Sequence, residues 1–148
     1  MRGVLNLGEI VGAHARLSPD KIAARDSRRA ITFAQWNARA CRLANALLGL
    51  GLRKGDRVAL LAHNRLEWME IYVALAKVGL VAVPVNFRLV DSEIRYIAEH
   101  CGARAFIVED ELIDSVEGIR DQLAIPTNGW IRIGDGVRPG WTGARGTA

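Results

Sequence analysis

Three short apolar runs, alternating with helical patterns, constrain the fold of this chain more than any other feature of its sequence. The runs are RVALLA from Arg57, LVAVPV from Leu80 and RAFIV from Arg104. A strand made of a near-continuous apolar run needs cover on both faces, and strands that alternate with helices over short connections pair in parallel through right-handed crossovers. We therefore predict an α/β fold, in which a mostly parallel sheet of three or four strands is flanked by helices on both faces.

The helices between these runs have recognisable starting points. Residues 33–50 carry one apolar stripe at helical spacing, and Thr32 and Gln35 form a predicted capping box at its start. The same reasoning predicts that Asn64 caps the next helix and that Asp91 caps the one after it. The remaining expected elements are a helix over residues 7–17, a hairpin over 22–32, a weak helix over 112–123 and a strand at 130–133.

Length, charge and cysteine content narrow the function classes. The 148 residues suit one domain, and the net charge of +4 comes from scattered side chains without a basic run, which argues against nucleic-acid binding. Cys41 and Cys101 fall at core-facing helical positions and are too few for a disulfide framework or a metal site. Neither a signal peptide nor the ~20 apolar residues of a bilayer span can be recognised, so we expect a cytoplasmic protein.

Two groups of polar residues follow predicted strands directly. His63 and Asn64 come after RVALLA, and Asn86 and Arg88 come after LVAVPV, whose Pro84 is expected at the strand end. In parallel α/β sheets, ligands collect outside the carboxyl ends of the strands, so these four residues are candidates for substrate binding. The simpler alternative is that the asparagine caps a helix and the arginine is solvated. A nucleophile triad, a metal-ligand set and a phosphate-binding glycine loop cannot be assembled from the sequence.

Several sequence fragments occur together in an order that resembles a known family. They are TF at Thr32, RLANAL at Arg42, KGDRVAL at Lys54, N-x-x-E at Asn64, AL-x-K-x-G at Ala74, VP-x-N-x-RL at Val83 and GARAFIV at Gly102. Each fragment is weak alone, but their joint order and spacing resemble the N-terminal portion of the AMP-binding, adenylate-forming enzymes. The resemblance is strongest to the fatty-acid and other acyl-CoA ligases.

This resemblance implies a reaction in which a carboxylic acid and Mg-ATP give an acyl-adenylate, and the acyl group then passes to coenzyme A. The family's phosphate loop, its aromatic-Gly-x-Thr-Glu segment and its catalytic lysine come later in the chain and are absent here. We therefore assign no catalytic residue and expect this chain alone to bind neither ATP, Mg nor coenzyme A. Asn86 and Arg88 match the family pattern and are candidates for support or for contact with the nucleotide part of coenzyme A.

The expected domain organisation is an N-terminal part of the synthetase domain over residues 1–125 and a Gly-rich, irregular or truncated tail over 126–148. The expected function is that of an acyl-CoA ligase fragment, inactive alone, whose partners in the complete enzyme are a fatty or other carboxylic acid and coenzyme A. An exposed apolar surface should receive the missing subdomain or a second copy of the chain. The alternative function is a non-catalytic α/β module that pairs with a full-length relative.

Overall fold

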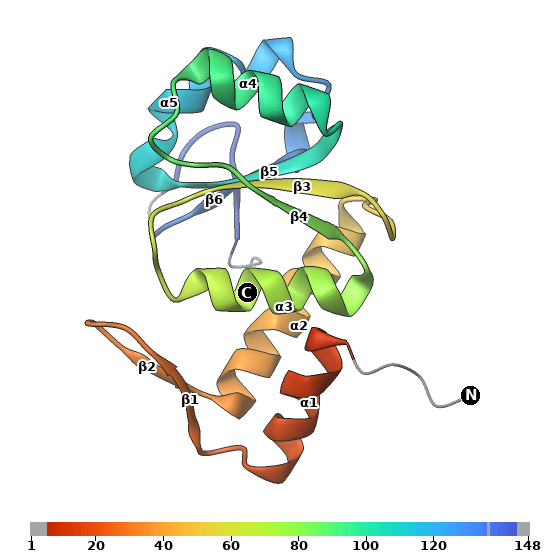
Figure 1. Cartoon of the computed structure of the whole chain (residues 1–148), viewed down its shortest axis with the longest axis vertical. Helices are drawn as coiled ribbons and strands as arrows, with labels where there is room; N and C mark the ends of the chain where they lie inside the picture. The colour runs from red at the N-terminus through yellow and green to blue at the C-terminus, as the bar shows by residue number, and fades with distance from the viewer. Residues whose placement is uncertain (1–5, 136, 145–148) are drawn as a thin grey trace.

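The computed structural model describes residues 6–135 and 137–144. Its centre is a parallel sheet of five strands in the order β4-β3-β5-β6-β7 (Figure 1). The strands are β3 (Arg57–Leu61), β4 (Val81–Pro84), β5 (Ala103–Glu109), β6 (Trp130–Ile133) and β7 (Thr142–Gly143). The predicted α/β class is confirmed, and the sheet has more strands than the three or four predicted.

Helices cover the two faces of this sheet and define two separate apolar cores (Figure 1). One face is covered by α2 (Phe33–Gly49) and α3 (Glu67–Val78), on which α1 (Leu7–Leu17) packs; the other is covered by α4 (Asp91–His100) and α5 (Asp114–Glu117). An antiparallel hairpin of β1 (Ile22–Arg25) and β2 (Ala30–Thr32) stands apart from the sheet. Short 3-10 turns occupy Asp110–Leu112, Arg120–Gln122 and Thr127–Gly129.

The start of α2 confirms the predicted capping box. The Thr32 hydroxyl accepts a hydrogen bond from the Gln35 backbone N–H at 3.2 Å, and the Gln35 side chain accepts one from the Thr32 backbone N–H at 3.0 Å. After Leu50, Gly51 takes a positive φ of 87°, a conformation that glycine adopts without steric cost. Local signals therefore fix both ends of this helix.

The predicted caps of the next two helices are wrong. Asn64 does not cap α3, which begins at Glu67, because the buried Leu66 and an added turn separate Asn64 from the helix. Asp91 is the first residue of α4 rather than its cap, and Val90 occupies the capping position. The Glu93 carboxylate accepts the Val90 backbone N–H at 3.1 Å, so only half of a capping box forms there.

The prediction that LVAVPV is buried on both faces is also wrong. In the part of the chain that the structure describes, β4 lies at the edge of the sheet and pairs only with β3, and Val81 is 44% exposed. An apolar run indicates a strand but does not say whether that strand is central. Pro84 ends β4, as expected for a residue without a backbone donor.

The Gly-rich segment after residue 125 contributes two strands, β6 and β7, to the sheet. Trp130 of β6 is 2% exposed and stacks on Phe106 of β5, with ring centroids 5.5 Å apart. The Arg120 guanidinium lies over the rings of both Trp130 and Trp141, 5.0 Å and 4.7 Å from their centroids. Interpretation of this segment as a truncated tail stays a prediction. None of the helices within the described ranges has the length and apolarity needed to cross a bilayer.

Candidate functional site

The strand order creates one crevice at the carboxyl edge of the sheet. The chain leaves β3 towards β4 on one side, and it leaves β5 towards β6 on the other side. Because β3 and β5 are neighbours, the connections that follow them diverge, and such a divergence is where open α/β sheets bind ligands. A hollow lies at this place, between His63 after β3, Glu109 at the end of β5 and the hairpin tip at residues 26–29.

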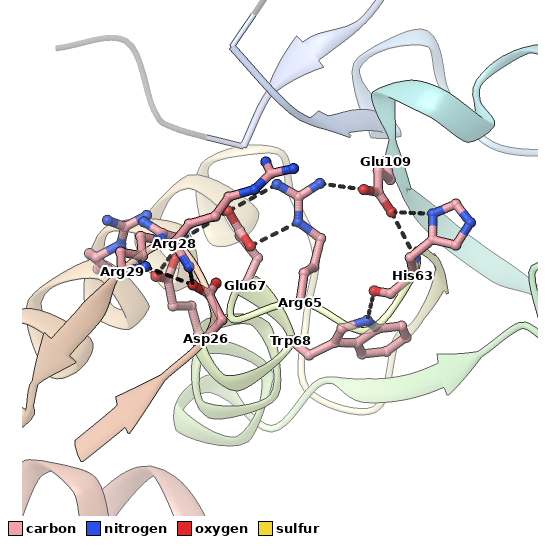
Figure 2. A network of polar contacts seen from close by, with 10 residues as sticks. Asp26, Arg28, Arg29, His63, Arg65, Glu67, Trp68 and Glu109 are labelled. Carbon is pink, nitrogen blue, oxygen red and sulfur yellow. Dashed lines mark hydrogen bonds and ion pairs between the residues drawn. The ribbon is translucent and has the colours of Figure 1, made fainter. Parts of the chain in front are cut away.

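Glu109 organises the floor of this crevice (Figure 2). Its Oε2 accepts the His63 backbone N–H at 2.7 Å and lies 3.1 Å from His63 Nδ1, while its Oε1 accepts a hydrogen bond from Arg65 Nη1 at 2.7 Å. The Glu109 side chain is 10% exposed, and those of His63 and Arg65 are 41% and 26% exposed. The carboxylate thus fixes the loop that follows β3 to the end of β5.

Opposite charges continue from Arg65 towards the hairpin. Arg65 contacts Glu67 through Nε at 2.8 Å and through Nη2 at 3.1 Å, and Glu67 in turn accepts a hydrogen bond from Arg29 of the hairpin at 2.8 Å (Figure 2). One turn further along α3, Glu70 pairs with Arg39 of α2 at 2.6 Å, a close ion pair without the geometry of a directed hydrogen bond. We call Arg29, Arg39, His63, Arg65, Glu67, Glu70 and Glu109 the charge network.

The charge network shifts the pKa of two of its members. Burial of the Glu67 carboxyl favours its neutral form, but hydrogen bonds from Arg65 and from its own backbone N–H, with the positive charges of Arg65 and Arg29, outweigh burial. The pKa of Glu67 is therefore held below its ordinary value. The hydrogen bond to Glu67 also raises the pKa of Arg65, so this guanidinium is charged at neutral pH.

The Glu67 pKa predicts a specific acid sensitivity. Because the pKa is lower in the folded than in the unfolded chain, the ionised carboxylate stabilises the fold above the unfolded pKa of about 4.3, and this contribution is lost as pH falls through the folded pKa. We expect Glu67→Gln to lower the free energy of unfolding by about 1 kcal/mol at pH 7 and by less at pH 3.5. Urea unfolding at both pH values measures this difference.

Glu99→Gln is the matched control for this prediction. Glu99 is 63% exposed and pairs with Arg95 on the surface of α4 at 3.4 Å, so its replacement should change stability by only a few tenths of a kcal/mol. An equal loss for Glu67→Gln at pH 7 and at pH 3.5 would show that the carboxylate charge does not carry the effect.

The four candidate residues from the sequence gather at the carboxyl ends of β3 and β4. The ring centroids of His63 and Phe87 lie 4.5 Å apart, and the Arg88 guanidinium lies 5.5 Å from the Phe87 centroid. Asn64 and Asn86 line one shallow hollow between α3 and the end of β4. Both asparagines and Arg88 are exposed, and Asn86 Oδ1 accepts the Arg88 backbone N–H at 3.0 Å, which holds the loop after β4 in a turn.

Sequence reasoning missed Glu109 and Arg65. Glu109 is 46 residues from His63 in the chain, and the two meet only because β5 lies beside β3. The available signal was an acidic residue ending an apolar strand, RAFIVE, at the edge of the sheet where ligands bind. No feature of the sequence singled out Arg65, because an arginine next to a predicted helix cap is ordinarily solvated.

The crevice suits ion pairing better than a metal. Ligand atoms of His63, Glu109 and Glu111 lie within 4.8 Å of one another. However, both Glu109 oxygens already accept hydrogen bonds, and the adjacent Arg65 guanidinium opposes a second cation. The arrangement therefore orients the loop after β3 rather than presenting a free ligand set.

The geometry defines a class of protein, a doubly wound α/β domain with a polar crevice where the connections after β3 and β5 diverge. A sequence model of the AMP-binding enzyme family matches residues 11–141, nearly the whole of this domain. The chain belongs to the AMP-binding enzyme family.

Individual relatives are acyl-CoA ligases. The chain is 38% identical over 125 residues to a long-chain-fatty-acid–CoA ligase, FadD13, from Mycobacterium tuberculosis, and 37% identical over 113 residues to a feruloyl-CoA synthase from an Amycolatopsis species. These alignments cover 82% and 76% of this chain. They cover 24% and 23% of the relatives, so the chain spans about a quarter of their length.

Solved structures agree with this assignment. The anthranilate CoA ligase AuaEII, in complex with anthranoyl-AMP, superposes with a TM-score of 0.88 at 32% identity, over 95% of this chain and 27% of that one. The N-terminal domain of FACL13 from Mycobacterium tuberculosis superposes with a TM-score of 0.79 at 29% identity, over 98% of this chain and 36% of that one. The described domain is therefore an N-terminal fragment of the ligase fold.

Proposed function

We propose that this chain supplies the N-terminal part of an ATP-dependent acyl-CoA ligase and is inactive without the remainder of that fold. The reaction is the conversion of a carboxylic acid, ATP and coenzyme A into an acyl-CoA through an acyl-adenylate. The observation that carries the proposal is the family match over residues 11–141, combined with coverage of only 24% of a 38% identical ligase. The names of the relatives include fatty, feruloyl and indoleacetate substrates, so they do not select one acid.

The described residues by themselves do not suit a nucleoside triphosphate. The crevice is lined by more carboxylates than guanidinium groups, and this net negative charge opposes a polyanion. The carboxylates are those of Asp26, Glu67, Glu109, Asp110, Glu111 and Asp135, and the guanidinium groups are those of Arg28, Arg29 and Arg65. Within residues 6–135 and 137–144, no helix is preceded by a glycine-rich loop that could present backbone N–H groups to phosphates. In this proposal, ATP and Mg bind the remainder of the complete enzyme.

We propose that Arg88 helps to bind coenzyme A. The other three candidates line and shape the same end of the sheet, and they are His63, Asn64 and Asn86. Arg88 is exposed next to the exposed Phe87 ring, and a guanidinium beside an aromatic face suits a phosphate together with a nucleotide base. The charge network fixes His63 and so positions the Phe87 side chain against it.

Complementation tests the proposal. The chain is mixed with, or co-expressed beside, the part of the Mycobacterium tuberculosis ligase that follows its matched region, and fatty-acid-dependent ATP–pyrophosphate exchange is measured. We expect exchange in the mixture and none with either part alone. In an active mixture, Arg88→Ala should raise KM for coenzyme A about tenfold without changing exchange, which does not need coenzyme A.

Absence of exchange, in a mixture whose two parts bind each other, would contradict the ligase role. It would favour the alternative function, a non-catalytic module that pairs with a full-length relative. An unchanged KM for coenzyme A in Arg88→Ala would remove Arg88 from the proposed site and leave the ligase role intact.

A further inference from the structure

Helix α1 turns its small residues towards the rest of the molecule and most of its large apolar residues towards solvent. Its buried residues are Gly8, Val11 and Gly12. A Cβ atom at Gly8 would lie 2.6 Å from the Lys77 side chain, so α1 packs closely on α3 through this face. The large side chains left outside are those of Leu7, Ile10 and Leu17, which are 49%, 43% and 79% exposed. Helices of soluble domains ordinarily bury such side chains, so this pattern indicates that the outside of α1 is a contact surface.

The exposed side of α1 is built for close approach by another helix. Ile10, Ala13 and Leu17 follow one another at spacings of three and four residues and so form one face, which we call the outer face of α1. The helix lies at the opposite end of the molecule from α4 (Figure 1). Because the middle residue, Ala13, is small, a second helix can cross there with one large apolar side chain on either side of the crossing.

Two opposite charges border the outer face along the same flank. Glu9 lies in the first turn of α1 and Arg16 in its last turn, and both are exposed. Because they are seven residues apart, they lie within about 20° of each other around the helix and about 10 Å apart along it. That separation is too long for an ion pair within the helix, and Arg16 makes no ion pair or hydrogen bond with any other residue of 6–135 and 137–144.

A second copy of this chain, with its α1 antiparallel, complements these features. A two-fold axis between antiparallel helices brings the same flank of both helices together, so Glu9 faces the partner's Arg16 and Arg16 faces the partner's Glu9. Ile10 then lies opposite the partner's Leu17, and the reverse contact forms by symmetry. A parallel pair would instead place the charged flank against the opposite flank of the other helix and would form neither ion pair.

We propose that two copies of this chain form a dimer through the outer face of α1, with the two helices antiparallel. This inference goes beyond the proposed function and does not depend on it. A membrane surface is a poorer occupant, because helices that lie on membranes carry mainly Lys and Arg beside their apolar face, whereas an acid borders this one. Two helices of 11 residues bury less than the ~1,600 Å² of a standard interface, so we expect a weak dimer, with a Kd of about 10–100 μM.

Sedimentation velocity of the full chain, from about 1 μM to 1 mM, tests the apolar contact. Leu17→Lys should raise the Kd of dimerisation at least tenfold, because each dimer loses two buried leucines and gains two like charges. Leu48→Lys is the matched control, since Leu48 is 45% exposed and also lies in the last turn of its helix, α2. Its Kd should stay within twofold of the wild type, and circular dichroism melts verify that both variants fold.

Exchange of the two charges tests the antiparallel arrangement. In Glu9→Arg and in Arg16→Glu, like charges meet twice in every dimer, so each variant alone should show a Kd about tenfold higher than the wild type. A mixture of the two variants in equal amounts allows a dimer of one copy of each, in which both ion pairs form again with their charges exchanged. The mixture should therefore dimerise with a Kd within threefold of the wild type.

The outcomes decide the inference without any enzyme assay. A dimer that Leu17→Lys weakens and Leu48→Lys does not, with recovery in the mixture of charge variants, supports it. A chain that is monomeric throughout, a dimer that Leu17→Lys leaves unchanged, or a mixture that does not recover overturns it. Binding of a monomeric chain to phosphatidylcholine vesicles, lost in Leu17→Lys, would likewise overturn it and assign the outer face to a membrane surface.

Discussion

Replacing Phe106 by alanine is expected to lower the free energy of unfolding by about 3–5 kcal/mol, the largest loss that we predict for a single substitution in this chain. Phe106 is fully buried on β5, the central strand of the sheet, and its ring stacks on Trp130. Trp130 in turn meets Trp141 edge to face, with ring centroids 5.6 Å apart. Removal of the Phe106 ring therefore leaves a cavity and also removes the support of two neighbouring indoles.

Chemical denaturation of Phe106→Ala, compared with Phe87→Ala, measures this loss. Phe87 is 37% exposed, so the same chemical change there should cost less than about 1 kcal/mol. Since typical domains are stable by about 5–15 kcal/mol, Phe106→Ala should move the midpoint strongly or leave the chain unfolded. If both variants lost the same small amount of unfolding free energy, the apolar core beneath α4 and α5 would not depend on the aromatic stack.

Replacing Glu109 by alanine is expected to cost about 2–4 kcal/mol, the second largest loss. The substitution leaves the His63 backbone N–H and the Arg65 guanidinium without their common acceptor. Arg65 keeps its contacts with Glu67 and is partly solvated, which places the cost below that of a fully buried pair. Glu109→Gln retains an acceptor oxygen without the charge. We therefore expect its free energy of unfolding to lie between that of the wild type and that of the alanine variant.

Urea unfolding of the two Glu109 variants and of Glu99→Ala at pH 7 tests this order. Glu99 belongs to a surface pair and provides an equivalent loss of a carboxylate outside the crevice. The order wild type, Gln, Ala in falling stability would support the role assigned to Glu109. Stabilities indistinguishable from that of Glu99→Ala would instead show that water replaces the carboxylate without cost.

Features set by neighbouring residues could be predicted from the sequence. The capping box at Thr32 and Gln35 involves residues three apart, and both of its hydrogen bonds form as predicted. The left-handed end of α3 at Gly79 likewise depends only on the backbone freedom of one residue. The α/β class could be predicted because alternation of strand and helix patterns leaves few ways to build a sheet.

Features set by strand order could not be predicted in the same way. The apolar run of β4 has the composition of a central strand, yet β3 already has β5 on its other side, and β4 remains at the edge. The pairing of Glu109 with His63 likewise depends on that order. The four candidate residues lie at the carboxyl ends of β3 and β4, where the sequence placed them, and their role in binding stays a prediction. Glu109, which joins the loop after β3 to β5, was not identified.

The parallel sheet also has a consequence for the time course of folding. No two adjacent strands of this sheet are joined by a tight turn: Arg57 of β3 pairs with Val81 of β4 and with Ala103 of β5. Each pairing brings together residues that are distant in the sequence, and the entropy cost of closing that loop arises before the strand contacts can stabilise it. We therefore expect sheet formation to limit the folding rate. The ribosome synthesises α1, the hairpin and α2 well before β5. Until β5 is made, β3 lacks one of its two neighbouring strands and its apolar side chains stay exposed. β3 is thus the segment most exposed to aggregation in the newly made chain.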